Sequence, residues 1–169
     1  VKIYYSFEDT PLGTGGAIAQ GAAELQLSSD ESIYVFNGDV LSAHDLSAQA
    51  ALHNEMQADA TLHLTKVDDA RAYGCVPINE VGEVLNFFEK MDNPIANTIN
   101  AGCYIFSSSM LERIPRGIVA SVERETFPMA LRSGARIYGY EDSRYWIDMG
   151  TPQSMIKASR DLILDPELS

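Results

Sequence analysis

The sequence is poor in basic residues, with 12 Lys and Arg against 24 Asp and Glu, and its formal net charge is −12. We do not expect nucleic acid as a partner, because binding a phosphate backbone requires a basic face and none is visible. A small phosphorylated ligand fits this charge if one cation, or a divalent metal held by carboxylates, supplies positive charge locally.

Cysteine is also scarce, and Cys75 and Cys103 lie far apart inside apolar, strand-like segments. This placement favours two buried thiols over a disulfide or a metal pair and fits a reducing cytoplasm. The longest apolar runs fall far short of the roughly 20 residues that span a bilayer, and no charged-then-apolar leader opens the chain. We therefore expect a soluble, cytoplasmic protein with no membrane partner.

A chain of 169 residues, 46% of them hydrophobic and 21% charged, has the size and composition of one globular domain. Strand-like runs alternate with helical stretches, which predicts an α/β fold with a mostly parallel sheet flanked by helices. The predicted strands are residues 1–6, 33–36, 60–67, 100–106, 136–140 and 145–148, with a hairpin over 73–91. Thr14 and Asp45 are predicted helix caps, and further helices are predicted to begin at Ser107 and Thr151. Residues 121–134 are predicted to hold another helix, bent or broken by Pro128 and closed by Gly134.

The central stretch is SIYVFNGDV, residues 32–40, whose unbroken apolar run predicts a strand buried on both faces. Asp39 stands at its carboxyl end beside Gly38, where an acid can hold a metal or a hydroxyl group. The alternative is that Asn37, Gly38 and Asp39 form only a turn, since all three are common turn residues.

Three further features carry candidate chemistry. Asp148 also ends a predicted strand, so it could share a metal with Asp39, although sequence spacing cannot show that the two converge. Lys90 follows an apolar strand and could bind a phosphate, or be a solvated surface lysine. The glycines of residues 13–16 precede a helix and present backbone amides suited to a base or a phosphate.

Five segments in order resemble the sugar-1-phosphate nucleotidylyltransferases, also called sugar-nucleotide pyrophosphorylases, over nearly the whole chain. They are PLGTGGAI (11–18), FNGDV (36–40), YGCV with FFEKM (73–76 and 87–91), NAGCYIF (100–106) and YWIDMGTP (145–152). Two more, IPRG (114–117) and SVERETFP (121–128), look most like the mannose-1-phosphate guanylyltransferase branch. The resemblance implies a Rossmann-like domain of the nucleotide-diphospho-sugar transferase type.

The resemblance also implies substrates, a cofactor and residue roles. A sugar-1-phosphate oxygen would attack the α-phosphorus of a nucleoside triphosphate and release pyrophosphate, with no covalent enzyme intermediate. The residues that match family positions are Asp39 and Asp148 for magnesium, Lys90 for the sugar phosphate, Glu89, Gly74 and Asn100 for the sugar, Leu12 and Gly13 for the base, and Gly38 near the ribose. Mannose-1-phosphate and GTP are the expected substrates.

The chain departs from the family pattern in two places. Met91 replaces the usual proline after the Glu-Lys pair, which we expect to matter little. The glycine-rich loop with an arginine and a lysine, which cradles the triphosphate, has no counterpart here. We therefore expect that the N-terminal part of the domain is absent from these 169 residues. We also expect that the chain alone is nearly inactive, and that an uncovered sheet edge favours pairing with another chain, as in a homo-oligomer.

Other functions stay open at this point. The sugar and base could be those of a glucose-1-phosphate thymidylyl- or adenylyltransferase. A non-catalytic relative could bind a sugar nucleotide and regulate a partner, although it would not need the metal acids and Lys90 together. A glycosyltransferase of similar fold is less favoured, because Val40 and Leu41 follow Asp39 where an Asp-x-Asp motif would be expected.

Overall fold

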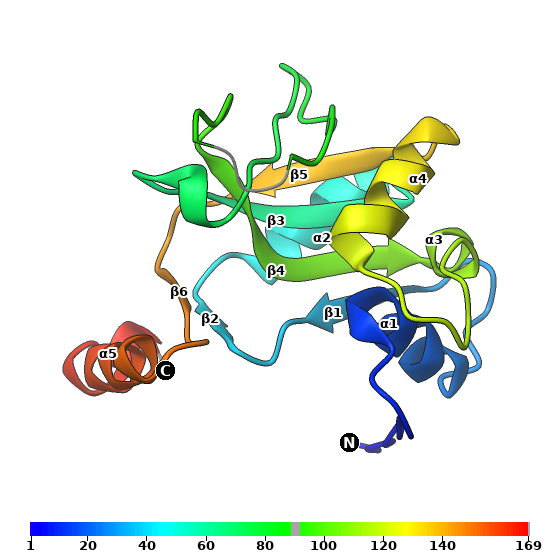
Figure 1. The fold of residues 1–169 in the computed structure, drawn as a ribbon, viewed down its shortest axis with the longest axis horizontal. Helices are drawn as coiled ribbons and strands as arrows, with labels where there is room; N and C mark the ends of the chain where they lie inside the picture. The colour runs from blue at the N-terminus through cyan, green and yellow to red at the C-terminus, as the bar shows by residue number, and fades with distance from the viewer. Residues whose placement is uncertain (89–91, 169) are drawn as a thin grey trace.

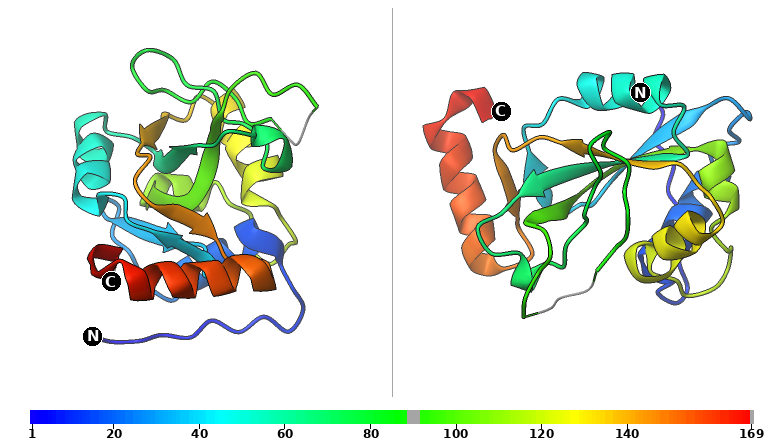
Figure 2. Two further views of the ribbon diagram at one scale, coloured as in Figure 1. Left: turned by 90° about the vertical axis from the view of Figure 1, so that its left-hand side faces the viewer. Right: turned by 90° about the horizontal axis from the view of Figure 1, so that it is seen from above.

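The computed structural model describes residues 1–88 and 92–168 (Figure 1). The helices are α1 (Gly13–Ala23), α2 (Leu46–Glu55), α3 (Ser108–Glu112), α4 (Phe127–Arg132) and α5 (Pro152–Leu164), with shorter turns η1 (Ala70–Ala72), η2 (Val122–Thr126, a π-helix) and η3 (Pro166–Leu168). The strands are β1 (Ser32–Phe36), β2 (Val40–Ser42), β3 (Ala60–Lys66), β4 (Thr98–Ser107), β5 (Ile137–Glu141) and β6 (Trp146–Asp148). Figure 2 shows α2 on one face of the main sheet and α1, α3 and α4 on the other, so the predicted α/β class is confirmed.

The main sheet has the strand order β1-β4-β3-β5, and β2 pairs with β6 in a separate antiparallel ribbon. Mostly parallel pairing was wrong for the described strands, because β4 runs antiparallel to both β1 and β3 and only β3 and β5 are parallel. The reason lies in residues 67–97. Lys66 pairs with Thr98, so this connection leaves and re-enters the sheet at the same end and must reverse the chain direction.

Burial follows position in the sheet rather than local pattern. On the central strand β3, Leu62 and Leu64 pack in the core with Phe127 of α4, whereas Thr61 and His63 are buried as well. Side chains on both faces of β3 are therefore buried. The expectation that 33–36 is buried on both faces was wrong, because β1 lies at the edge of the described sheet and Phe36 is 55% exposed.

Most helix starts are confirmed, since the side chains of Asp45, Ser107 and Thr151 accept hydrogen bonds from the first turns of α2, α3 and α5. Ser121 caps η2 in the same way, which was not predicted. The cap at Thr14 was wrong, because its hydroxyl instead accepts from the backbone amide of Val122, 2.9 Å away. Residues 1–6 form no strand, since no described strand lies beside them to pair with.

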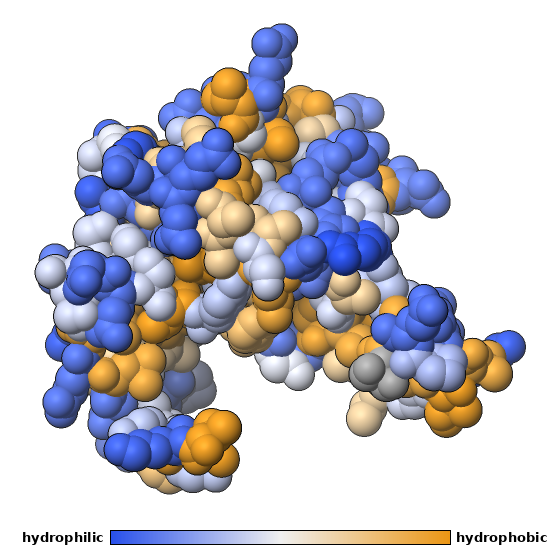
Figure 3. Space-filling model, turned by 180° about the vertical axis from the view of Figure 1, so that it is seen from behind, coloured by the Kyte–Doolittle hydropathy of each residue, from blue (hydrophilic) through white to orange (hydrophobic). Residues whose placement is uncertain are grey.

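The exposed apolar side chains include some on α5 and some on the N-terminal segment. Figure 3 shows them over α5 and over the N-terminal segment, where they include Met155, Ile156, Ile163 and Phe7. Within residues 1–88 and 92–168, no helix combines the length and apolar character needed to cross a membrane. Pairing with another chain through such a surface stays a prediction.

Candidate active site

The structure brings Asp39 and Asp148 together in the β2–β6 ribbon. Val40, the neighbour of Asp39, pairs with Asp148, and the amide of Met149 donates to the Asp39 carbonyl at 2.7 Å. A Cβ atom placed on Gly150 would lie 2.9 Å from Asp148 Oδ1 and 3.8 Å from Asp39 Oδ2. The two carboxylate oxygens are therefore at most about 6.7 Å apart, the sum of those two distances.

The donor set of this pair fits a hard cation. Asp39 is exposed and Asp148 is half-buried, with Asp148 Oδ1 accepting the Gly150 amide at 2.7 Å. Among the described residues, no cluster of three or more His, Cys, Asp or Glu side chains could hold a metal. A cation at the pair would take its other ligands from water or phosphate, as Mg²⁺ does when one or two carboxylates bind it.

A second feature is an open cavity of about 390 Å³ between the hairpin, β4 and η2. It contains Gly74 and Asn100, two residues predicted for the sugar site, but neither of the two acids. Its lining residues are Tyr73, Gly74, Val76, Phe87, Phe88, Asn100, Glu123, Arg124 and Pro128. Apolar walls with a few polar groups are typical of small-ligand sites.

Asn100 is held in one orientation at the edge of this cavity. Its Oδ1 accepts the Gly102 amide at 3.1 Å, and its Nδ2 donates to the hydroxyl of Tyr104 and to the Glu123 carboxylate. Burial raises the pKa of Tyr104, so its hydroxyl stays protonated. Glu123 is an exposed acid that the sequence analysis did not single out, although it lies within the matched segment 121–128.

The cavity and the acid pair are linked through Trp146 of β6. The Tyr73 ring, which lines the cavity, meets the Trp146 ring edge-on with centroids 5.8 Å apart. Trp146 Nε1 donates to the Ala101 carbonyl of β4 at 2.9 Å. Because Asp148 follows two residues later on the same strand, these contacts connect the strand that ends in Asp148 to the wall of the cavity.

The glycine-rich turn is fastened to the segment that leads into η2. The Leu12 carbonyl accepts the Ala120 amide at 2.9 Å, and the Gly15 amide donates to the Ala120 carbonyl at 2.8 Å. At Gly13, where φ is +70°, a Cβ would lie 2.7 Å from the same carbonyl oxygen. The Gly15 amide is therefore used within the chain, whereas a ligand at the other amides of the turn stays a prediction.

Gly38 is open, whereas its neighbour Asn37 packs against Gly102. Nothing lies within 4 Å of a Cβ placed on Gly38. The neighbouring Asn37 donates its amide to the Gly102 carbonyl at 2.8 Å, and its side chain fills the space that a Cβ on Gly102 would need. Asn37 and Gly102 thus fix the turn before Asp39, a role that sequence analysis missed because the two are distant in sequence.

Glu89 and Lys90, together with Met91, lie outside the described residues, so their predicted roles stay predictions. Phe88, just before them, is paired with Cys75 in the hairpin through two backbone hydrogen bonds of 3.0 and 3.1 Å. Cys75 and Cys103 are free and buried, as predicted. Burial raises the pKa of Cys103 to about 12, so it is not a ready nucleophile.

The sequence pattern of the nucleotidyl transferase family matches residues 1–164. The chain is 48% identical over 164 residues to mannose-1-phosphate guanylyltransferase of Mycobacterium tuberculosis, covering 96% of this chain and 45% of that protein. It is 36% identical over 166 residues to probable mannose-1-phosphate guanylyltransferase 2 of Arabidopsis thaliana, covering 98% of this chain and 45% of that protein. The chain thus spans about half the length of these curated relatives.

Solved structures agree on the fold. HddC from Yersinia pseudotuberculosis, complexed with GMP-PN, superposes with a TM-score of 0.70 at 28% identity, over 92% of this chain and 64% of that one. A putative glucose-1-phosphate thymidylyltransferase from Bacillus anthracis superposes with a TM-score of 0.74 at 21% identity, over 93% of this chain and 63% of that one. With the family pattern matched along nearly its whole length, the chain belongs to the nucleotidyl transferase family.

Proposed function

We propose that the protein transfers a guanylyl group from GTP to mannose-1-phosphate, giving GDP-mannose and pyrophosphate. The observation that carries the proposal is the convergence of Asp39 and Asp148 beside Gly150, in a chain that is 48% identical to a mannose-1-phosphate guanylyltransferase. Several relatives that share more than a third of their aligned residues with the chain carry the same activity in their names. These names support the sugar and the base.

In this proposal the chain positions substrates and neutralises charge rather than forming a bond to them. Asp39 and Asp148 would hold Mg²⁺, which when bound offsets negative charge on the phosphates. Gly74, Asn100 and Glu89 would bind the sugar, with Lys90 at its phosphate. Leu12 and Gly13 would lie against the base and Gly38 near the ribose.

Two features of the site support these assigned roles. Asn100 is oriented by hydrogen bonds to its own strand, so its direction does not depend on ligand. Trp146 connects the sugar-side cavity to the acid-bearing strand through Tyr73. A sugar phosphate in the cavity would then sit beside the cation that faces the triphosphate. The free, buried thiols support a reducing cytoplasm as the place of the reaction.

The test is a substrate matrix on the complete protein. GTP, ATP, dTTP and UTP are each combined with mannose-, glucose- and galactose-1-phosphate, and pyrophosphate release is measured with Mg²⁺. We expect GTP with mannose-1-phosphate to have the highest kcat/KM, by about 10-fold or more over each pair that differs in one partner, since one unpaired buried polar group costs on that order.

Each alternative has its own result in this matrix. A faster reaction with glucose-1-phosphate and dTTP or ATP would replace the proposed substrates with those of a thymidylyl- or adenylyltransferase. Tight binding of GDP-mannose with no turnover of any pair would indicate a regulatory binding protein. The same assay on residues 1–169 alone tests the expectation that this chain has little activity by itself.

A further inference from the structure

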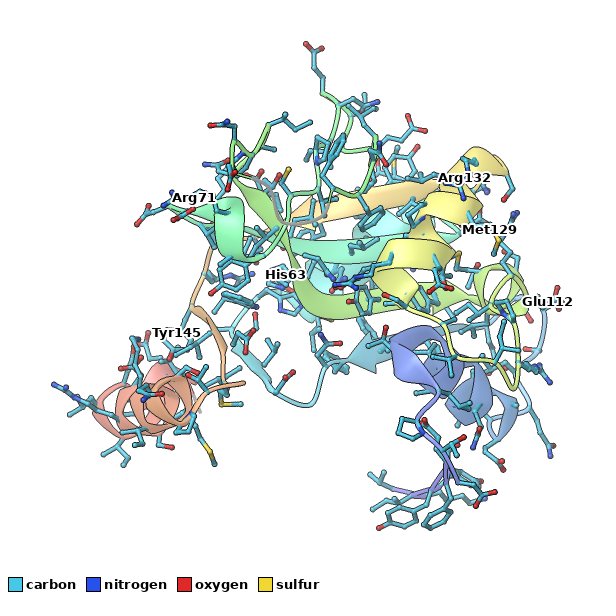
Figure 4. All side chains as sticks on the ribbon, viewed as in Figure 1. His63, Arg71, Glu112, Met129, Arg132 and Tyr145 are labelled. Atoms are coloured by element: carbon cyan, nitrogen blue, oxygen red, sulfur yellow. The ribbon has the colours of Figure 1, made fainter. Side chains whose placement is uncertain are left out.

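Two histidines join the β2–β6 ribbon to the main sheet. His44 follows the end of β2, and His63 projects from the central strand β3 (Figure 4). Their rings stack with centroids 3.8 Å apart and an interplanar angle of 13°. The ribbon carries Asp39 just before β2 and Asp148 at the end of β6, so the two acids lie at one end of the ribbon and His44 follows its other end.

Hydrogen bonds fix the His44 ring. The Gln49 side chain donates its amide to the Thr61 carbonyl at 3.2 Å, which turns its Oε1 toward His44 Nε2, 3.0 Å away. His44 Nε2 must then carry the proton, and Nδ1 accepts from the Ser42 hydroxyl at 2.9 Å. The ring is therefore held from β2 on one side and from the buried Gln49 of α2 on the other.

His63 is fixed in the complementary way. Its Nε2 donates to the Asp142 carbonyl at 2.9 Å, and its Nδ1 is buried without a hydrogen-bond partner among the described residues. The His63 ring is fully buried and therefore neutral, and it contacts His44 through the face of the ring. Burial lowers the pKa of both histidines, which keeps the stack uncharged near neutral pH.

The two chain segments that enter the ribbon meet at the same point. The Asp142 carboxylate accepts the Asp45 amide at 3.1 Å and is paired with Arg144, with an N–O distance of 2.5 Å. The Ala43 amide donates to the Tyr145 carbonyl at 2.9 Å. Asp142 therefore contacts His63 through its backbone and holds residue 45 through its side chain, so both flanks of the ribbon depend on this junction.

We propose that the His44–His63 stack is a positioning element that sets where the Asp39 and Asp148 carboxylates stand relative to the sugar-side cavity, by fixing the ribbon against strand β3. The inference rests on the proposed metal role of the acid pair. Because the ribbon is only three residue pairs long, a rotation at the junction moves both carboxylates relative to the sugar-side cavity. Mutating a residue that hydrogen-bonds to a metal ligand typically changes metal affinity by about 10- to 100-fold, and the histidine stack acts one step further away, through the ribbon that carries both acids.

The test replaces His63 with leucine in the complete protein. Mn²⁺ serves as the probe, and its dissociation constant is measured by calorimetry with and without nucleotide. We expect His63→Leu to weaken Mn²⁺ binding by about 10-fold or more and to speed hydrogen exchange of the amides in residues 38–42 and 145–149. His44→Leu, at a half-buried position, should act in the same direction and serves if His63→Leu folds poorly.

His53→Leu is the matched control. His53 is also a buried histidine of neutral character, but it bonds Thr61 and Ser32 at the other end of α2, away from the ribbon. The His53→Leu substitution should lower the stability of the protein without changing its Mn²⁺ affinity. Equal Mn²⁺ affinity in all variants and wild type would overturn the positioning role. If the wild type binds no Mn²⁺, the metal role of the acid pair is wrong. If hydrogen exchange of the ribbon amides is unchanged in His63→Leu, the positioning role is overturned as well.

Discussion

Asn100 on β4 donates a hydrogen bond to the carboxylate of Glu123 on η2, which places an exposed acid at the mouth of the 390 Å³ cavity. The Asn100 side chain is held by Tyr104 and by the Gly102 amide as well, so Glu123 is the adjustable member of this pair. A sugar hydroxyl entering the cavity would meet both groups.

From this pairing we predict that Glu123→Gln raises the KM for the sugar-1-phosphate by about 10-fold and changes kcat little. The reason is that a hydrogen bond to a charged group contributes about 1.5–3 kcal/mol, and the amide keeps the shape without the charge. Steady-state kinetics with varied sugar phosphate checks this. Glu125→Gln, an exposed acid on the same turn, is the control. An equal change in both variants would argue for a general charge effect.

The acid pair yields a second prediction. Asp39→Asn and Asp148→Asn should each lower kcat by about 100-fold or more, because each removes charge from the same proposed cation site. The double variant should lose little more than either single one, since residues that act as a unit are not additive. Turnover and half-saturating Mg²⁺ are the measurements. Asp30→Asn, an exposed acid before β1, should behave as wild type. If the losses of kcat in the two single variants instead added fully in the double variant, the two acids would act independently rather than at one cation site.

The packing of Asn37 against Gly102 gives a third prediction. Gly102 has a φ of +77°, and an added Cβ would lie 2.8 Å from Asn37 Nδ2. We expect Gly102→Ala to lower the free energy of unfolding by about 1–3 kcal/mol through backbone strain and this clash. Gly117→Ala, at a φ of +70° with nothing within 4 Å, carries the strain alone and should cost about 1 kcal/mol. Denaturant unfolding measures the loss of unfolding free energy in each variant. Equal losses in Gly102→Ala and Gly117→Ala would show that the contact with Asn37 costs nothing.

A fourth prediction concerns pH. Burial lowers the pKa of His63 to about 4 from its ordinary 6.5. Between those values the unfolded chain binds a proton that the folded chain does not, so stability falls as pH decreases. His63 alone should remove about 2 kcal/mol between pH 7 and pH 5. Denaturant unfolding at both pH values measures this. The loss of unfolding free energy between pH 7 and pH 5 should be about 2 kcal/mol smaller in His63→Leu. An equal loss in the variant and the wild type would show that other groups cause the pH dependence.

Local signals predicted much of the fold. The caps at Asp45, Ser107 and Thr151 followed from residues within one helical turn, and the structure contains them. Thr14 has the same chemistry, yet its hydroxyl bonds Val122, more than a hundred residues away. Strand direction and edge position also depend on distant partners, which is why β1 was predicted to be buried on both faces and the sheet to be mostly parallel.

The candidate site, too, was only partly predictable from the sequence. Asp39 and Asp148 could be chosen because acids at strand ends are visible in the sequence, but their convergence depends on the β2–β6 register. Glu123 carried no such signal, since it lies in a polar turn among other charged residues. Asn37 and Gly102 pack together across two strands, and only the fold shows that contact. Glu89 and Lys90 stay predictions from the sequence.

The attachment of the glycine-rich turn to Ala120 and Val122 has a consequence for protein synthesis. The turn at residues 12–15 leaves the ribosome about a hundred residues before the backbone groups that hold it. Contacts between segments so far apart form late, because closing a long loop costs entropy before any contact repays it. During translation the start of α1 is thus unanchored until Ala120 and Val122 have emerged, and chaperone binding or proteolysis there would compete with folding.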